Sequence, residues 1–221
     1  MKSGYLVRSY RQALEALASG DHEQAFLSFE RVIEFKNDDA GLWVGLGWSA
    51  LETCRYDRAR EAFEKARGLD PDHGLACQGL VLVHLREEKF IKALEIVDEV
   101  LSRAPGDLEL RIAKIAALMG VGRRRAGSRL ARLVLAAEPE ARPGVLQIAR
   151  SLLDSGWSQE AYDLSRRCLR LDPQDDDARA VTGACLVSQG KVEEGVNLLV
   201  ATLDREPGHL YARAVLARVT S

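Results

Sequence analysis

The chain has 221 residues, of which 47% are hydrophobic and 29% charged, as in a globular protein with enough apolar material for a continuous core. Its formal net charge of −2 at pH 7 argues against a nucleic-acid-binding protein that works through bulk electrostatics. Arginine greatly outnumbers lysine, which is typical of proteins from GC-rich bacterial genomes.

The N-terminal segment does not resemble a signal peptide, because Arg8, Arg11 and Glu15 interrupt it before an apolar core forms. No apolar run approaches the roughly 20 residues that a membrane helix requires. The cysteines show no CxxC spacing and stand among apolar or small neighbours, which predicts buried free thiols. They are Cys54, Cys77, Cys168 and Cys185. Together these features favour a cytoplasmic location.

Proline recurs with a strict period. Five of the six prolines lie 34 residues apart, and only Pro143 stands outside the series. The series is Pro71, Pro105, Pro139, Pro173 and Pro207. A small residue lies twelve positions before each proline, and the same column extends upstream: Ala25, Ala59, Ala93, Gly127, Ala161 and Gly195. A period of this length indicates a repeat architecture.

Each repeat has the pattern of two helices joined by a bend. Apolar residues recur at helical spacing over about thirteen residues, stop at a bend position and then resume. The bend position holds Gly20, Cys54, Glu88, Gly122, Gly156 and Gly190. Proline ends the second helix because it lacks an N–H and disfavours helix in the preceding residue. Acidic residues near the prolines are expected to cap the next helix: Asp70, Asp72, Asp172 and Asp175 to Asp177.

This pattern resembles the tetratricopeptide repeat (TPR), a 34-residue unit with W-x2-L-G-x2-Y, then A-x3-F, then P. Residues 40–73 match it best, through Trp43, Leu46, Gly47, Tyr56, Ala59, Phe63, Ala66 and Pro71. The aromatic residue of the first helix is missing there, since Ala50 takes its place. Residues 108–141 match least, with Arg111 in the tryptophan position, and residues 6–39 have Asn37 in the proline position.

The resemblance implies an all-α fold, a right-handed α-solenoid of six TPR helix pairs in a single domain over residues 1–221. The expected repeats are 6–39, 40–73, 74–107, 108–141, 142–175 and 176–209, followed by a C-terminal capping helix at 210–221. One helix pair cannot bury its own apolar face, so neighbouring repeats stack and share a core.

The family's usual peptide-binding groove is lined by the first helix of each pair. The equivalent positions here are Tyr10, Leu14, Leu17, Val44, Trp48, Leu51, Gln78, Leu82, Leu85, Ile112, Ala116, Met119, Leu146, Arg150, Leu153, Ala180, Ala184 and Val187. Most are apolar, which favours an apolar or amphipathic ligand. The alternative is that some, above all Leu17, Leu51, Leu85 and Leu153, only pack the core. Trp48 favours a ligand contact, because Trp43, Leu46 and Gly47 already fill the core positions of that helix.

Two charge features bear on partners. TPR clamps for chaperone tails use lysine, arginine and asparagine in the groove, whereas this groove offers mainly Arg150, with Arg86 at its edge. From Leu110 to Ala137 no acidic residue occurs, and a convex basic patch is expected at Arg129, Arg132, Arg166, Arg167 and Arg170. Such a patch would dock an acidic partner, an anionic membrane surface or a second copy of the chain, or is an ordinary solvated face.

No catalytic, metal-binding or cofactor-binding motif is present in the sequence. The four histidines are scattered, no phosphate-binding glycine loop occurs, and no nucleophile signature such as G-x-S-x-G appears. We therefore expect a non-catalytic adaptor or scaffold without a cofactor. It would bind a protein or peptide, and no nucleic acid, during assembly of a bacterial complex or as a chaperone of a secretion substrate. The alternatives are a self-assembling homo-oligomeric scaffold and a regulatory subunit of a separate enzyme.

Overall fold

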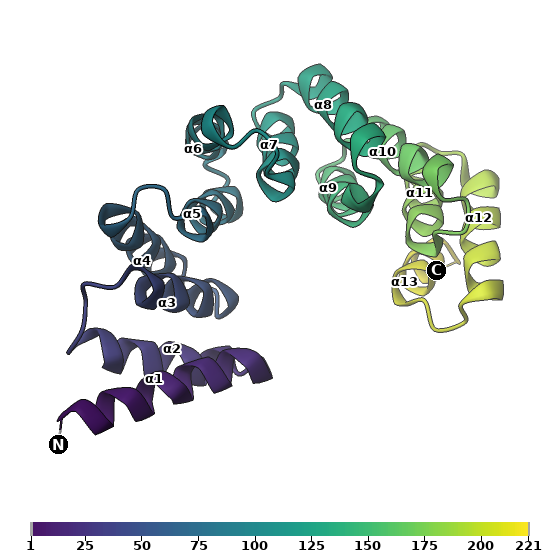
Figure 1. The fold of residues 1–221 in the computed structure, drawn as a ribbon. Coiled ribbons are helices and arrows are strands. Elements are labelled where there is room, and N and C mark those ends of the chain that lie inside the picture. Colours follow the sequence, from purple (N-terminus) through teal and green to yellow (C-terminus); the bar gives the residue numbers. More distant parts are fainter. Residues whose placement is uncertain (1, 221) are drawn as a thin grey trace. The chain divides into compact units, whose positions relative to one another are not determined.

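The computed structural model describes the backbone of residues 2–220 and the side chains of residues 7–219. Over this range the chain forms thirteen α-helices and one short 3-10 helix, and no strand (Figure 1). The all-α class and the solenoid of helix pairs are thus confirmed. In the described part of the chain, no helix is long and apolar enough to cross a bilayer.

The helices alternate as the period predicts. The first helices are α1 (Lys2–Ser19), α3 (Ala40–Glu52), α5 (Gly74–Arg86), α7 (Leu108–Gly120), α9 (Arg142–Asp154) and α11 (Asp176–Ser188). The second helices are α2 (His22–Ile33), α4 (Tyr56–Leu69), α6 (Phe90–Arg103), α8 (Arg124–Ala137), α10 (Ser158–Leu171) and α12 (Val192–Arg205). The 3-10 helix η1 (Pro139–Ala141) precedes α9, and α13 (Leu210–Thr220) follows α12.

The helices group into two compact units, residues 1–113 and residues 114–221, with the boundary inside α7. We call them unit 1 and unit 2 and describe each by itself. That residues 1–221 act as one domain stays a prediction.

The bend between the two helices of each repeat has a left-handed backbone. The four glycines of the bend column have φ between 76° and 81°. Cys54 and Glu88, which occupy the same column, also have positive φ, at 59° and 57°. The column is therefore defined by its backbone conformation, which glycine adopts without the strain that a Cβ introduces.

Proline and aspartate mark the junctions between repeats. α4, α6, α8, α10 and α12 each end one or more residues before the proline of their repeat. Asp175 Oδ1 accepts a hydrogen bond of 2.8 Å from the N–H of Ala178 and so caps α11. Asp172 instead accepts from the N–H of Gln174 within the turn, and α5 has no side-chain cap at its N-cap residue His73. The expected capping by acidic residues thus holds at Asp175 and takes a turn-stabilising form at Asp172.

Two phenylalanines of unit 1 pack where glycines leave room for them. A Cβ on Gly47 would lie 2.6 Å from Cε1 of Phe63, and a Cβ on Gly79 would also meet that ring. A Cβ on Gly45 would meet the ring of Phe29. Both phenylalanines are almost fully buried. The close approach of α3 and α5 to α2 and α4 therefore depends on these glycines.

The cysteines differ in one respect from the expectation. All four are free, and Cys77, Cys168 and Cys185 are buried, but Cys54 is exposed. Cys54 was wrongly expected in the core, because its position is the left-handed bend, where the side chain points into solvent. Burial raises the pKa of Cys168 and of Cys185 to about 12, so these two thiols stay protonated at neutral pH.

Candidate functional site

The first helices of unit 1 carry accessible apolar side chains at equivalent positions of the 34-residue repeat. Tyr10 and Leu14 on α1 are 43% and 45% exposed. Trp48 on α3 and Leu82 and Leu85 on α5 are half-buried. Leu17, at the end of the α1 series, is also half-buried and packs against the core. These positions recur every 34 residues, so the repeat places them equivalently on successive first helices.

Two further exposed apolar residues lie on the same side of these helices but are not among the groove residues predicted from the sequence. Val7 and Leu75 are 57% and 51% exposed and lie 68 residues apart, in the same column of their repeats. The helical spacing could have predicted them, because Val7 lies three residues before Tyr10 and Leu75 lies three residues before Gln78, the equivalent of Tyr10 two repeats later. We call the set Val7, Tyr10, Leu14, Leu17, Trp48, Leu75, Leu82 and Leu85 the first-helix face.

Trp48 contributes to the core and to the surface. Its ring lies edge-on to Phe63, with centroids 5.6 Å apart and an interplanar angle of 78°. The side chain packs against the clusters around Leu46 and Phe63 and remains partly accessible. Trp43 is buried, and its Nε1 donates a hydrogen bond of 2.8 Å to the carbonyl of Asn37. Trp43 therefore has a packing role, whereas Trp48 also presents part of its ring to solvent.

Other predicted positions of unit 1 are less accessible. Val44 and Leu51 on α3 are buried at 6% and 8% exposure and belong to the core. Gln78 donates from Nε2 to Asp107 Oδ2 at 3.0 Å, which ties α5 to the turn before α7. Ile112 is half-buried. The accessible part of the face therefore lies on α1, at Trp48 and along α5.

The same columns in unit 2 are mostly filled by the chain itself. Met119, Leu146, Ala180 and Ala184 are buried, and Ala116, Leu153 and Val187 are half-buried. Met119 packs beside Gly127, where an added Cβ would lie 3.0 Å from its sulfur.

Arg150 is held in unit 2 by two partners. It forms an ion pair with Asp177, and its guanidinium carbon lies 4.7 Å from the centroid of the Tyr211 ring. Burial raises the pKa of Tyr211. His209 lies 3.4 Å from the same aspartate through Nε2, and its Nδ1 accepts from the N–H of Ala212 at the start of α13. These contacts join α9, α11 and α13.

The predicted basic patch lies on the second helices of unit 2. Arg129 and Arg132 on α8 and Arg166 and Arg170 on α10 are exposed, and Arg167 is half-buried. α8 packs against α10. That the arginines of the two helices form one convex patch stays a prediction.

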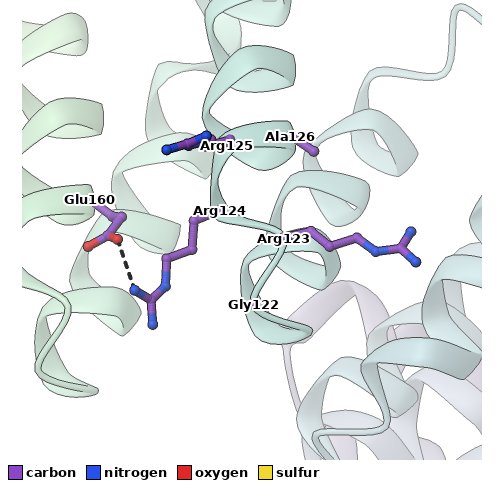
Figure 2. Close-up of a pocket in the computed structure, with 6 residues that line it drawn as sticks. All are labelled: Gly122, Arg123, Arg124, Arg125, Ala126 and Glu160. Carbon is purple, nitrogen blue, oxygen red and sulfur yellow. Dashed lines mark hydrogen bonds and ion pairs between the residues drawn. The ribbon is translucent and has the colours of Figure 1, made fainter.

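An open hollow of about 580 Å³ lies where α8 begins, lined by Gly122 to Ala126 and by Glu160. Arg124 is fixed there, since it lies 3.3 Å from Glu160 and its guanidinium carbon is 3.6 Å from the centroid of Trp157. Figure 2 shows Arg124 turned toward Glu160 and Arg123 turned the opposite way. The three consecutive arginines do not converge, so the hollow offers no clustered set of donors for one anion. Over the side chains that the structure describes, no group of three or more His, Cys, Asp or Glu is placed to hold a metal ion.

A family model described as tetratricopeptide repeat matches residues 16–82 and 152–219. The chain belongs to the tetratricopeptide repeat family. The two matches fall in unit 1 and unit 2, and the stretch between them contains the repeat 108–141, which departs most from the motif.

Curated relatives are much longer than this chain. Superkiller complex protein 3 of Homo sapiens is 30% identical over 80 residues, which is 36% of this chain and 5% of that protein. Tetratricopeptide repeat protein 37 of Xenopus laevis is 30% identical over 70 residues, 32% of this chain and 4% of that protein. The chain thus spans about a twentieth of the length of the curated relatives that it matches.

Solved structures share the fold at low identity. The type IV pilus biogenesis factor PilW has a TM-score of 0.73 and 16% identity, over 96% of this chain and 98% of PilW. A tetratricopeptide repeat protein of Parabacteroides merdae has a TM-score of 0.73 and 11% identity, over 98% and 84% of the two chains. YrrB, described as a TPR protein with an unusual peptide-binding site, has a TM-score of 0.52 and 18% identity, over 86% and 97%. The family assignment makes the chain a protein-interaction scaffold in general terms.

Proposed function

We propose that this TPR protein is a non-catalytic adaptor that holds an apolar or amphipathic segment of a partner protein on the first-helix face of unit 1, during assembly of a larger complex or as a chaperone of a secretion substrate. The observation that carries the proposal is the exposure of Tyr10 and Leu14 on α1, in columns that line the family's binding surface, together with the exposure of Leu75 on α5. Exposed apolar side chains that cluster on one face are typical of a protein-binding site.

The energy that such a face supplies is sufficient for a moderate affinity. Burying one large apolar side chain contributes on the order of 1.5–3 kcal/mol. Tyr10, Leu14 and Leu75, with the accessible parts of Trp48 and Leu82, provide five such contacts. Their sum of roughly 7.5–15 kcal/mol is similar in size to the roughly 4–15 kcal/mol that association costs. A dissociation constant in the micromolar range, which corresponds to about 8 kcal/mol, is therefore reached where the association cost is near its lower end.

The names of two proteins with this fold agree with such a role. PilW is described as a pilus biogenesis factor, and YrrB as a protein with a peptide-binding site. We extend both activities, assembly and peptide binding, to this chain as part of the proposal.

The test uses a phage-displayed peptide library selected on the wild-type protein. Selected peptides are then titrated against a variant with Tyr10→Glu, Leu14→Glu and Leu75→Glu, all on exposed positions of the face. The matched control carries Leu27→Glu, Ile91→Glu and Val200→Glu, which are exposed apolar positions on second helices. Circular dichroism checks that both variants are folded.

We expect apolar or amphipathic peptides that bind the control like the wild type and the face variant at least about tenfold more weakly, since tenfold corresponds to about 1.4 kcal/mol. Peptides that bind the face variant and the wild type equally would overturn the proposal.

A further inference from the structure

The outward charge of the second helices reverses at α8. Three columns of the 34-residue repeat point away from the core on these helices. In the first, Glu30, Glu64 and Asp98 are followed by Arg132 and Arg166. In the second column, Glu61 and Glu95 are followed by Arg129. In the third column, Glu23, Asp57 and Ile91 are followed by Arg125. The repeat therefore carries arginine on α8 at positions where the earlier second helices carry mainly carboxylates.

Arginines of unit 1 are paired across neighbouring repeats. Arg55 lies 2.7 Å from Glu23, Arg58 lies 2.5 Å from Glu30, and Arg67 lies 2.8 Å from Glu99. Such pairs neutralise the charges of the second helices within the chain. At exposed positions each contributes roughly 0–1 kcal/mol, so their main effect is on the surface charge.

Five exposed arginines of α8 and α10 lack such partners among the described residues. α8 contains no carboxylate, and its only ion pair within the described range is that of Arg124 with Glu160. Arg125, Arg129, Arg132 and Arg170 form no ion pair with the described residues. Arg166 lies over the ring of Tyr162, with 5.7 Å between its guanidinium carbon and the ring centroid, and forms no ion pair there either. The guanidinium groups of five arginines are thus available to bind an external anion. We call this set the arginine surface: Arg125, Arg129, Arg132, Arg166 and Arg170.

The arginine surface also contains apolar side chains. Buried residues of α8 lie at Gly127, Ala131, Val134 and Leu135. Arg129, Arg132 and Leu133 occupy the opposite side of the helix, and Leu133 is 55% exposed. Leu171, next to Arg170 at the end of α10, is 46% exposed. The one exposed carboxylate beside the arginines of α10 is Asp163, which accepts from Gln159.

We propose that the arginine surface is a second binding site, which takes an acidic segment of a partner protein with apolar side chains between its carboxylates. Guanidinium groups bind carboxylates through two parallel hydrogen bonds, and the stem of arginine packs on apolar groups. Arg125, Arg129 and Arg132 rise along α8 by steps of about 6 Å and about 4.5 Å. Carboxylates two residues apart in an extended segment, about 6.6 Å from each other, match the larger step.

A protein segment fits this surface better than other polyanions. A single-stranded nucleic acid requires aromatic side chains on which its bases stack, and Tyr162, the aromatic residue on α10, is half-buried under Arg166. Interfacial helices that bind membranes insert large apolar side chains from a continuous face. On α8 and α10 the exposed leucines are isolated and flanked by arginine.

The experiment titrates a short fluorescein-labelled peptide of alternating glutamate and leucine into the full chain and follows fluorescence anisotropy. The surface variant carries Arg129→Glu, Arg132→Glu and Arg166→Glu. The control variant carries Arg11→Glu, Arg31→Glu and Arg213→Glu, which are exposed arginines on α1, α2 and α13 with the same change in net charge. A peptide with lysine in place of glutamate is the matched ligand.

We expect the acidic peptide to bind the wild type and the control variant with similar affinity and the surface variant at least about tenfold more weakly, because charge complementarity becomes repulsion. Binding to the wild type weakens as NaCl rises from about 0.05 to about 0.3 M, since screening shortens the Debye length. The lysine peptide does not bind.

Four outcomes would overturn the proposal. The first is equal loss of affinity in the surface and control variants. The others are tighter binding of phosphatidylglycerol vesicles than of the peptide, tighter binding of oligothymidine, and salt-dependent self-association of the wild type that the surface variant lacks. The surface variant leaves the first-helix face unchanged. The peptides selected in the test of the proposed function should therefore still bind it, even if the arginine surface proves not to bind the acidic peptide.

Discussion

Glu88 tests the idea that the bend column is selected for a left-handed backbone. Its φ of 57° is the conformation that four glycines adopt in the other bends. Its side chain is exposed, so replacing it removes no packing. We expect Glu88→Gly to stabilise the protein.

The magnitude follows from two opposing terms. A left-handed conformation costs an L-residue about 1–2 kcal/mol, which glycine does not incur. Glycine also makes the unfolded chain more flexible, which costs about 0.4–1 kcal/mol. The net gain in the free energy of unfolding is about 0.5–1 kcal/mol. At about 2–4 °C per kcal/mol for a chain of this size, the melting temperature should rise by about 1–4 °C.

Two further variants separate the backbone from the side chain. Glu88→Ala keeps the strain and removes the carboxylate, so it should leave stability nearly unchanged. Gly156→Ala introduces the strain at φ 81°, where a Cβ meets no atom within 4 Å, and should destabilise by about the amount that Glu88→Gly gains. Urea unfolding followed by circular dichroism gives the midpoints, with unchanged slopes expected. The reasoning fails if Glu88→Gly lowers the midpoint or if Gly156→Ala leaves it unchanged.

Three other predictions concern packing, reactivity and pH. Gly47→Ala should lower the free energy of unfolding by about 1–3 kcal/mol because its Cβ meets Phe63, whereas Gly68→Ala, in open space on α4, should raise it by up to about 1 kcal/mol; equal effects in urea unfolding would contradict this. In the native protein a disulfide reagent should modify Cys54 alone, and the buried thiols only after unfolding; mass spectrometry showing more than one modified cysteine would refute it. Burial lowers the pKa of His84 below its ordinary value of 6.5, so below about pH 6.5 the unfolded chain takes up a proton that the folded chain does not, and stability falls. His84→Gln should reduce the loss of melting temperature between pH 7 and pH 5.5, and an identical pH dependence in both proteins would exclude this cause.

The repeat period was sufficient to predict the fold because it records local chemistry. Proline ends a helix, and a small residue allows two helices to approach, wherever the chain folds. Cys54 shows the limit of this reasoning. Its neighbours and residue type indicated burial, but the bend conformation that it shares with Glu88 directs the side chain into solvent.

The accessible part of the face depends on contacts that the period does not encode. Tyr10 and Val44 are equivalent in the repeat, yet their exposures are 43% and 6%. Val44 lies in a cluster to which α1, α2 and α4 contribute buried residues, whereas α1 packs mainly on α2 among the described residues. The pairing of Arg150 with Tyr211, 61 residues apart, also follows from packing alone.

The different use of one column in the two units explains where a partner is expected. In unit 2, α13 places Tyr211 against Arg150 and helps to bury Ala180, so residues of the chain itself cover these positions of the first helices. In unit 1, Tyr10 and Leu14 of α1 receive no such cover among the described residues. Exposed tyrosine and leucine side chains on one helix face contribute to the free energy of binding when a partner buries them. The proposed apolar ligand is therefore expected on unit 1. Unit 2 instead offers charge, because α8 and α10, two of its three second helices, carry exposed arginines that form no ion pair with the described residues.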